Sequence, residues 1–207
     1  TKVPVTVIYS DDKGENWTTC ELDNIYNADY YYVKFFDSDN GVVVCGYAKS
    51  NDTNESSKIY KTSNGGESWD MVGSGPATNI IKGVVYVSAD VGFFCYDYVD
   101  GMDSNLYKTD DGGKTFAKVM LEAQELDSSA ANSQNQETKS DSGTTYGTSE
   151  STEQLKWNDV YKEALVPVVD STGLITIYLT QGKNGMYNDG KTAAKYQSSD
   201  NGSTWKY

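Results

Sequence analysis

The string "YKTDDGGKTF" at residues 107–116 decides the fold, because close copies of it occur three more times in the chain. The copies are "YSDDKGENW" at 9–17, "YKTSNGGESW" at 60–69 and "YQSSDNGSTW" at 196–205. All four share the pattern Ser/Thr-x-Asp/Asn-x-Gly-x-x-aromatic. A string that recurs at intervals near 50 residues indicates a repeat architecture, in which each copy belongs to one structural unit.

The spacing of the four strings predicts one interrupted repeat. Their glycines, Gly14, Gly66, Gly113 and Gly202, are 52, 47 and 89 residues apart. The long third interval contains residues 122–154, which are almost entirely Ser, Thr, Gln, Asn, Gly, Ala and acidic residues. Such a segment cannot bury enough apolar surface to fold by itself. Without these 33 residues the interval is 56, so we expect a single domain over 1–207 with a polar insertion at about 122–154.

Each interval also contains the same order of short apolar runs. β-branched and aromatic runs separated by Asp, Asn, Ser and Gly predict antiparallel strands. These runs are 31–36, 42–48 and 58–62, then 80–87, 93–98 and 105–109, then 163–169, 174–179 and 194–199. A weak helical pattern near 153–164 is the one exception. Four strands in about 50 residues are typical of a propeller blade. The predicted fold class is all-β, with β-propeller-type blades of four antiparallel strands and about three and a half blades visible.

The repeated string suits the turn between the third and fourth strands of a blade. Asp or Asn at its third position can accept hydrogen bonds from the backbone N–H groups that follow. The Gly supplies the positive φ of a bulged hairpin, and the final aromatic is expected to be buried beside the turn. The residues with these structural roles are Ser10, Asp12, Gly14, Trp17, Thr62, Asn64, Gly66, Trp69, Thr109, Asp111, Gly113, Phe116, Ser198, Asp200, Gly202 and Trp205.

These strings resemble Asp boxes, also called BNR repeats, of the sialidase-like, sortilin-like and photosystem-assembly-factor-like β-propellers. The resemblance covers essentially all of the chain outside 122–154. It implies that the strings are structural hairpins remote from any active site, and that their acidic residues are not catalytic.

The composition excludes several functions of such propellers. The chain has a net charge of −13, no His, and no Arg among its 17 basic residues. Sialidases of this fold hold the substrate carboxylate with three Arg, because a guanidinium forms two parallel hydrogen bonds with it. The Arg-rich patch of the photosystem-assembly relatives is equally missing. Clustered cations for nucleic acid are also lacking, and no apolar run approaches the ~20 residues that span a bilayer. We therefore expect no sialidase activity, no nucleic-acid partner and no membrane insertion.

Neither a cofactor nor a metal is expected. The string "DSDNG" at 37–41 is one residue short of a calcium-loop pattern and is interpreted as a turn. Cys45 and Cys95 lie within apolar runs and are expected to be buried, unreactive thiols. One disulfide plus a free thiol is the alternative, since Cys20 makes the number of cysteines odd.

The predicted binding surface is the end of the blades opposite the boxes. The loops that meet there are 21–29, 48–57, 74–79, 97–105, 122–164 and 182–193. They carry Tyr and Trp beside Asp and Asn, which suits sugar rings or a polar protein surface. The candidate binding residues are Tyr26, Tyr98, Asp100, Asp103, Trp157 and Tyr187. The alternative is that these loops are solvated and have no special role.

The function expected from these features is that of an extracellular or cell-surface binding module, which recognises glycan or protein and is not an enzyme. The alternative is a glycoside hydrolase that uses paired loop carboxylates such as Asp100, Asp103 or Asp189. Closed propellers need about four or more blades, so we expect further blades from a longer chain or from a second copy.

Overall fold

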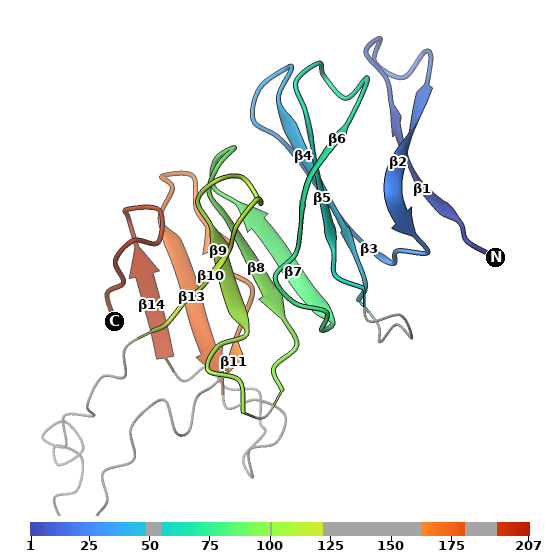
Figure 1. Cartoon of the computed structure of the whole chain (residues 1–207). Helices are drawn as coiled ribbons and strands as arrows, with labels where there is room; N and C mark the ends of the chain where they lie inside the picture. Colours follow the sequence, from blue (N-terminus) through green and yellow to red (C-terminus); the bar gives the residue numbers. More distant parts are fainter. Residues whose placement is uncertain (49–54, 100, 122–162, 181–193) are drawn as a thin grey trace, which may run out of the picture.

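The computed structural model describes residues 1–48, 55–99, 101–121, 163–180 and 194–207 (Figure 1). All regular structure in these residues is β, and they include no helix. The predicted insertion at 122–154 lies outside them. Of the predicted helical pattern near 153–164, only Glu163 and Ala164 are described, and they form a strand.

The strands form four antiparallel sheets in chain order. Sheet 1 consists of β1 (Pro4–Tyr9) and β2 (Thr18–Tyr26). Sheet 2 has the order β3 (Tyr30–Phe35), β4 (Gly41–Gly46), β5 (Lys58–Thr62) and β6 (Asp70–Ser74). Sheet 3 repeats it with β7 (Ile81–Tyr86), β8 (Gly92–Tyr96), β9 (Leu106–Thr109) and β10 (Ala117–Lys118). Each strand therefore pairs with its neighbour along the chain.

Sheet 4 has the same order with one interruption. Strands β11 (Glu163–Ala164) and β12 (Val168–Val169) both pair with β13 (Ile175–Thr180), which pairs with β14 (Ala194–Ser198). Pro167 lies between β11 and β12 and has no N–H to donate to a ladder, so the first strand is broken there. A bridge between Gln197 and Lys206 lies where a fourth strand would pair.

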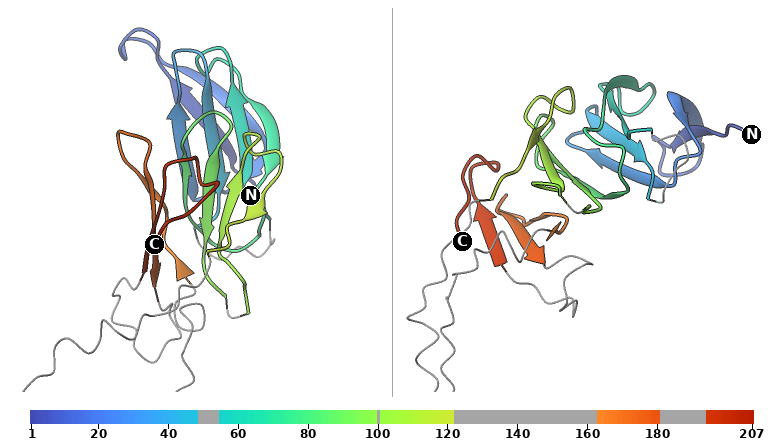
Figure 2. Two further views of the ribbon diagram at one scale, coloured as in Figure 1. Left: turned by 90° about the vertical axis from the view of Figure 1, so that its left-hand side faces the viewer. Right: turned by 60° about the horizontal axis from the view of Figure 1, so that its bottom comes forward.

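The sheets pack face to face along an arc (Figures 1 and 2). One buried cluster contains Val5 and Leu22 of sheet 1 with Val43 and Tyr60 of sheet 2. The next joins sheets 2 and 3, and the third joins sheets 3 and 4. Successive four-stranded antiparallel sheets with a core between each pair are the blades of part of a β-propeller. The predicted fold class is confirmed.

The four repeated strings are the turns at one end of the sheets, and we call them the box hairpins (10–17, 62–69, 109–116 and 198–205). In the third, the Thr109 hydroxyl donates to Asp111 Oδ1 at 2.8 Å and accepts from the Gly113 N–H at 2.8 Å. Asp111 Oδ1 also accepts from the Thr115 N–H at 2.9 Å. The other three box hairpins repeat these bonds. The hydrogen bonds of each turn therefore close within seven consecutive residues.

These hydrogen bonds lower the pKa of the box carboxylates. Backbone and side-chain donation from Asn16 lowers the pKa of Asp12 to about 2. Donation from Thr115 lowers the pKa of Asp111, and donation from Ser198 and Thr204 lowers that of Asp200. The box carboxylates are therefore held in the ionised form.

The predicted burial of the box aromatics is wrong. Trp17 is 64% exposed, and Trp69, Phe116 and Trp205 are half-buried. These three rings pack against the core between their own sheet and the preceding one. Trp205 lies edge-on against Phe93 of sheet 3 at 6.1 Å between ring centroids, whereas Phe116 lies 4.9 Å from Phe94 of its own sheet. No sheet precedes sheet 1 among the described residues, so nothing covers Trp17.

All three cysteines are free thiols, so the alternative with a disulfide is wrong. Cys45 and Cys95 are buried as expected. Burial raises the pKa of both thiols to about 12, which keeps them protonated.

Candidate functional site

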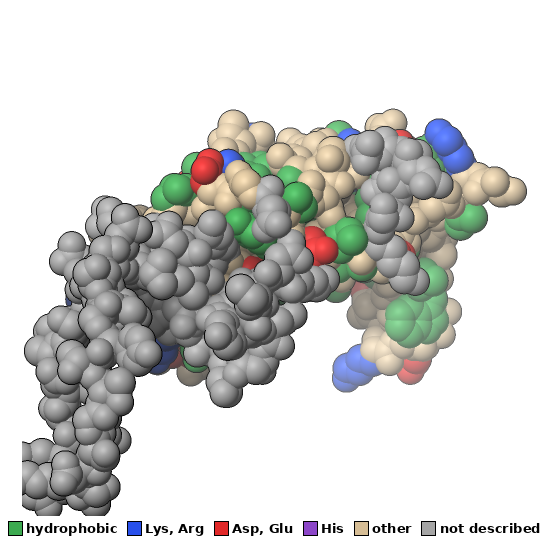
Figure 3. Space-filling model, turned by 90° about the horizontal axis from the view of Figure 1, so that it is seen from below, with side chains coloured by type: hydrophobic (Ala, Val, Ile, Leu, Met, Phe, Trp, Pro, Cys, Tyr) green, Lys and Arg blue, Asp and Glu red, His purple; other side chains and the backbone are tan. Residues whose placement is uncertain are grey.

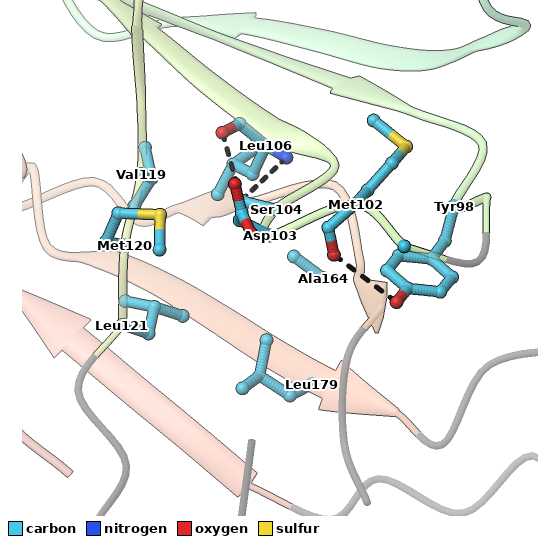
Figure 4. Close-up of a pocket in the computed structure, with 11 residues that line it drawn as sticks. Tyr98, Met102, Asp103, Ser104, Leu106, Val119, Met120, Leu121, Ala164 and Leu179 are labelled. Carbon is cyan, nitrogen blue, oxygen red and sulfur yellow. Dashed lines mark hydrogen bonds between the residues drawn. The ribbon is translucent and has the colours of Figure 1, made fainter. Parts of the chain in front are cut away.

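A pocket of about 360 Å³ lies between sheets 3 and 4 at the end opposite the box hairpins (Figure 4). Figure 3 views the molecule from this end, where hydrophobic and acidic side chains are interspersed on the described surface. The pocket is lined by Tyr98, Gly101, Met102, Asp103, Ser104, Leu106, Val119, Met120, Leu121, Ala164 and Leu179. Most of these side chains are apolar.

Loops and strands of sheets 3 and 4 supply this lining (Figure 4). The connection between β8 and β9 supplies Tyr98 and residues 101–104, and β9 supplies Leu106. The segment after β10 supplies 119–121, and β11 and β13 supply Ala164 and Leu179. Leu179 is only 5% exposed, whereas Met120 is 60% exposed. The pocket thus has an aliphatic floor and a thioether at its rim.

Asn105 fixes the two sheets that form the pocket. Its amide nitrogen donates to Tyr96 O at 2.8 Å and to Ala164 O at 2.9 Å, and its Oδ1 accepts from the Ala164 N–H at 2.8 Å. The side chain is fully buried. Hydrogen bonds to a buried amide contribute more to stability than exposed ones, because losing a partner leaves a buried polar group unsatisfied. Asn105 therefore sets the position of β11 against sheet 3.

The loop that carries Tyr98 closes on itself. The Tyr98 hydroxyl donates to Met102 O at 3.3 Å, and the Met102 N–H donates to Val99 O at 3.0 Å. The Ser104 hydroxyl donates to Leu106 O at 3.2 Å and accepts from its N–H at 3.1 Å. The loop thus holds Met102 and Asp103 at the pocket without help from a ligand.

Asp103 is the one carboxylate among the residues that line the pocket. It pairs with Lys118 at 3.2 Å, and 71% of its side chain is exposed. Within the described ranges, no group of three or more His, Cys, Asp or Glu could hold a metal ion. In the same ranges no helix is long and apolar enough to cross a membrane.

The structure brings together two of the six predicted binding residues, Tyr98 and Asp103. Tyr26 does not line the pocket: it ends β2 in sheet 1 and is 36% exposed, with Lys2 Nζ 4.9 Å from its ring centroid. The predicted loop 21–29 is accordingly wrong for 21–26, which are strand. The other three candidates, Asp100, Trp157 and Tyr187, and the alternative acid Asp189 lie outside the described residues.

The apolar half of the pocket and the role of Asn105 were not predicted from the sequence. Met120 and Leu121 follow the third box hairpin and directly precede the polar insertion, and apolar residues at such a boundary were an available signal. Nothing in the sequence marks Asn105, because Lys58 and Ala194 stand at the equivalent place in the other repeats.

Comparison with known proteins gives distant structural similarity alone. No family profile and no curated protein matches the chain. A GH74 enzyme from Niastella koreensis superimposes with a TM-score of 0.49 at 16% identity, over 97% of this chain and 25% of that one. YCF48 bound to D1 peptide superimposes with a TM-score of 0.38 at 17% identity, over 99% of this chain and 62% of that one. This chain therefore spans only part of the length of each of these proteins.

Proposed function

We propose that this chain is a non-catalytic binding module of the Asp-box propeller type, which recognises a protein segment at the pocket between sheets 3 and 4. The observation that carries the proposal is the lining of this pocket, which combines aliphatic and thioether side chains with a single charged residue. Pockets with mostly apolar walls and a few placed polar groups are the common form of binding site.

The lining suits an apolar side chain of a protein ligand. Met102 and Met120 are unbranched and polarisable, so they adapt to ligands of different shape. Leu121 and Leu179 extend the same apolar surface. The exposed carboxylate of Asp103 can exchange its pairing with Lys118 for a cation on the ligand. A net charge of −13 also favours a basic partner, because it steers association electrostatically.

Glycan binding is the second candidate, and Tyr98 beside Asp103 favours it. An aromatic ring next to a carboxylate can stack on a sugar and accept its hydroxyl groups. The glycosidase alternative is less well supported, because that reaction uses two carboxylates about 5–9.5 Å apart. Among the described lining residues Asp103 has no second carboxylate beside it, and it pairs with Lys118.

The test compares Met120→Asp with Val3→Asp on a peptide array, a glycan array and a panel of chromogenic glycosides. The two side chains are 60% and 59% exposed, so neither substitution should unfold the protein, and Val3 lies in the N-terminal segment before β1. We expect apolar, basic peptides to bind, Met120→Asp to weaken them at least tenfold, and Val3→Asp to leave them unchanged. Binding confined to glycans would contradict the protein ligand, and glycoside turnover abolished by Asp103→Asn would contradict the non-catalytic role.

A further inference from the structure

One edge of β1 in sheet 1 is unpaired among the described residues, whereas the equivalent strand edges of sheets 2 and 3 are paired. β1 is followed by a box hairpin, as are β5 and β9, so it occupies the third-strand position of its sheet. β5 pairs on one side with β6 and on the other with β4, and β9 pairs likewise with β10 and β8. Among the described residues β1 pairs with β2 alone. An unpaired strand edge is a template for another strand.

An apolar groove of about 660 Å³ runs along this edge, between β1 and β3. None of the residues that line it is charged, although 23% of the chain is charged. On its β3 wall, Tyr31 is 59% exposed and Val33 is 61% exposed. A contiguous apolar surface of this kind marks an interaction site.

The interface between sheets 2 and 3 shows what covers the equivalent surface. Val84 of β7 stands where Val33 stands in β3, since Val84 pairs with Phe94 as Val33 pairs with Val43. Val84 is only 5% exposed. Val84 is covered by β3, the first strand of the preceding sheet.

Three side chains of β3 also satisfy the inner edge of β7. The Tyr30 hydroxyl accepts from the Val84 N–H at 2.8 Å, and the Tyr32 hydroxyl accepts from the Tyr86 N–H at 3.0 Å. Lys34 Nζ donates to Tyr86 O at 2.5 Å. The corresponding groups of β3 belong to Val33 and Phe35, and no described side chain bonds to them.

The sheet 2 wall of the groove carries a further unsatisfied group. Trp69 lines the groove, and its indole N–H is buried with no acceptor among the described residues. A buried donor without an acceptor is costly. A strand in the groove would bring backbone carbonyl groups close to it.

We propose that this groove is the docking site of a two-stranded β-hairpin from a polypeptide segment outside residues 1–207. Its outer strand adds antiparallel to the free edge of β1, as β4 adds to β5. Its inner strand lays β-branched and aromatic side chains over Tyr31, Val33 and Phe35, with a Tyr-x-Tyr-x-Lys pattern like that of Tyr30–Lys34. Main-chain bonds to β1 supply affinity, and the alternate side chains supply specificity. The ligand is thus a β-hairpin rich in β-branched and aromatic residues, and the site is separate from the pocket between sheets 3 and 4.

The probe is a synthetic peptide of residues 30–46, which has the required strand pair and tyrosine pattern. We expect saturable one-to-one binding to the intact protein, measured by calorimetry, with amide exchange slowed at least tenfold in β1. A scrambled peptide of the same composition should not bind. No binding of the peptide up to its solubility limit, or binding without protection of β1, would overturn the proposal.

A pair of charge variants locates the site. Val33→Lys places a charge in the groove, whereas Val168→Lys places one at a side chain of similar exposure in sheet 4 (61% and 57%). The first should weaken peptide binding at least tenfold, and the second should leave it unchanged. Equal effects of the two would overturn the proposal. A concentration-dependent dimer of the protein alone, abolished by Val33→Lys, would identify a second copy as the occupant and would also overturn it.

Discussion

Tyr86 and Phe35 stand at the same place in successive sheets, yet only one of them is buried. Each ends the first strand of its sheet and covers the glycine that begins the second. A Cβ added to Gly92 would lie 2.8 Å from the Tyr86 ring, and one added to Gly41 would lie 3.0 Å from the Phe35 ring. Tyr86 is fully buried, whereas Phe35 is 43% exposed.

The difference comes from the preceding sheet and not from the sheet that carries the ring. Tyr86 lies against Tyr32 and Phe36 of sheet 2, with centroid distances of 6.2 and 6.3 Å. Phe35 has Trp69 of its own sheet at 5.9 Å, and among the described residues no inner strand of sheet 1 lies against it. The burial of a ring in a blade of this fold therefore depends on the neighbouring blade.

The largest expected effect is a difference in stability between variants that lack the Tyr86 ring and variants that lack the Phe35 ring. Tyr86→Ala removes a fully buried aromatic and should destabilise the protein by about 3–5 kcal/mol. Phe35→Ala removes a ring that is already 43% exposed and should cost about 1 kcal/mol. Urea unfolding of both variants measures the difference. Equal losses of stability would show that burial by the preceding sheet is not what distinguishes the two positions.

A second comparison concerns the glycines of two box hairpins. Gly113 and Gly14 both have positive φ, 105° and 91°, so an alanine at either costs about 1–2 kcal/mol. At Gly113 the new Cβ would also lie 3.0 Å from Ile59 Cγ2 of sheet 2 and 3.1 Å from the Tyr86 hydroxyl. Crowding of this kind adds about 1–3 kcal/mol. At Gly14 only Trp17 lies within reach, at 3.6 Å.

Gly113→Ala should therefore destabilise the protein clearly more than Gly14→Ala does. Thermal melts of the two variants under identical conditions provide the measurement. If Gly14→Ala is the worse of the two, the contact between the third box hairpin and sheet 2 is not stabilising.

Neighbouring tyrosines of β3 give a smaller and more local test. Tyr32 accepts the Tyr86 N–H, so Tyr32→Phe leaves that backbone donor without an acceptor, at a cost of about 1–2 kcal/mol. Tyr31 faces the groove and donates to Ala28 O at an exposed position. Tyr31→Phe should change stability by less than about 0.5 kcal/mol.

Amide exchange at Tyr86 distinguishes this effect from a general loss of stability. Exchange of that N–H should accelerate in Tyr32→Phe by more than exchange elsewhere in sheet 3, and it should be unchanged in Tyr31→Phe. If amide exchange accelerated uniformly across sheet 3, the Tyr32 hydroxyl would not be the acceptor that protects the Tyr86 N–H.

The smallest expected effect is a dependence of stability on pH. Three box hairpins contribute to it through an Asp, whereas the second has Asn64 at that position. Hydrogen bonds lower the folded-state pKa of Asp12 to about 2 and also lower that of Asp111, whereas Asn64 cannot titrate. A carboxyl with a lowered folded-state pKa contributes stability above its unfolded pKa of about 3.9, and this contribution is lost as the pH falls through the folded value.

We therefore expect the urea midpoint of the wild-type protein to fall between about pH 4 and pH 2. Asp111→Asn should make this fall shallower, and Asn64→Asp should make it steeper. A pH profile identical in all three proteins would show that the box carboxylates do not contribute to stability.

Local chemistry made the box hairpins and the strands predictable from the sequence. The bonds from Thr109 to Asp111 and from Gly113 to Thr109 close within five residues, so the string contains all that the turn needs. The β-branched and aromatic runs likewise predicted the strands to within a few residues. The phase of the four strings then gave the order of strands in each sheet. The residues of the pocket were only partly predictable, because Tyr98 and Asp103 share one loop whereas Leu179 joins them from a distant strand.

Tertiary structure alone decided burial and the meeting of distant segments. Trp17 and Phe116 end the same motif, but Trp17 is 64% exposed because no described sheet precedes its own. Asn105 bonds to Ala164, 59 residues away, and no pattern in either segment indicates that contact. Short-range hydrogen bonds are encoded where they form, whereas the environment of a side chain depends on surfaces that other parts of the chain, or another polypeptide, bring to it.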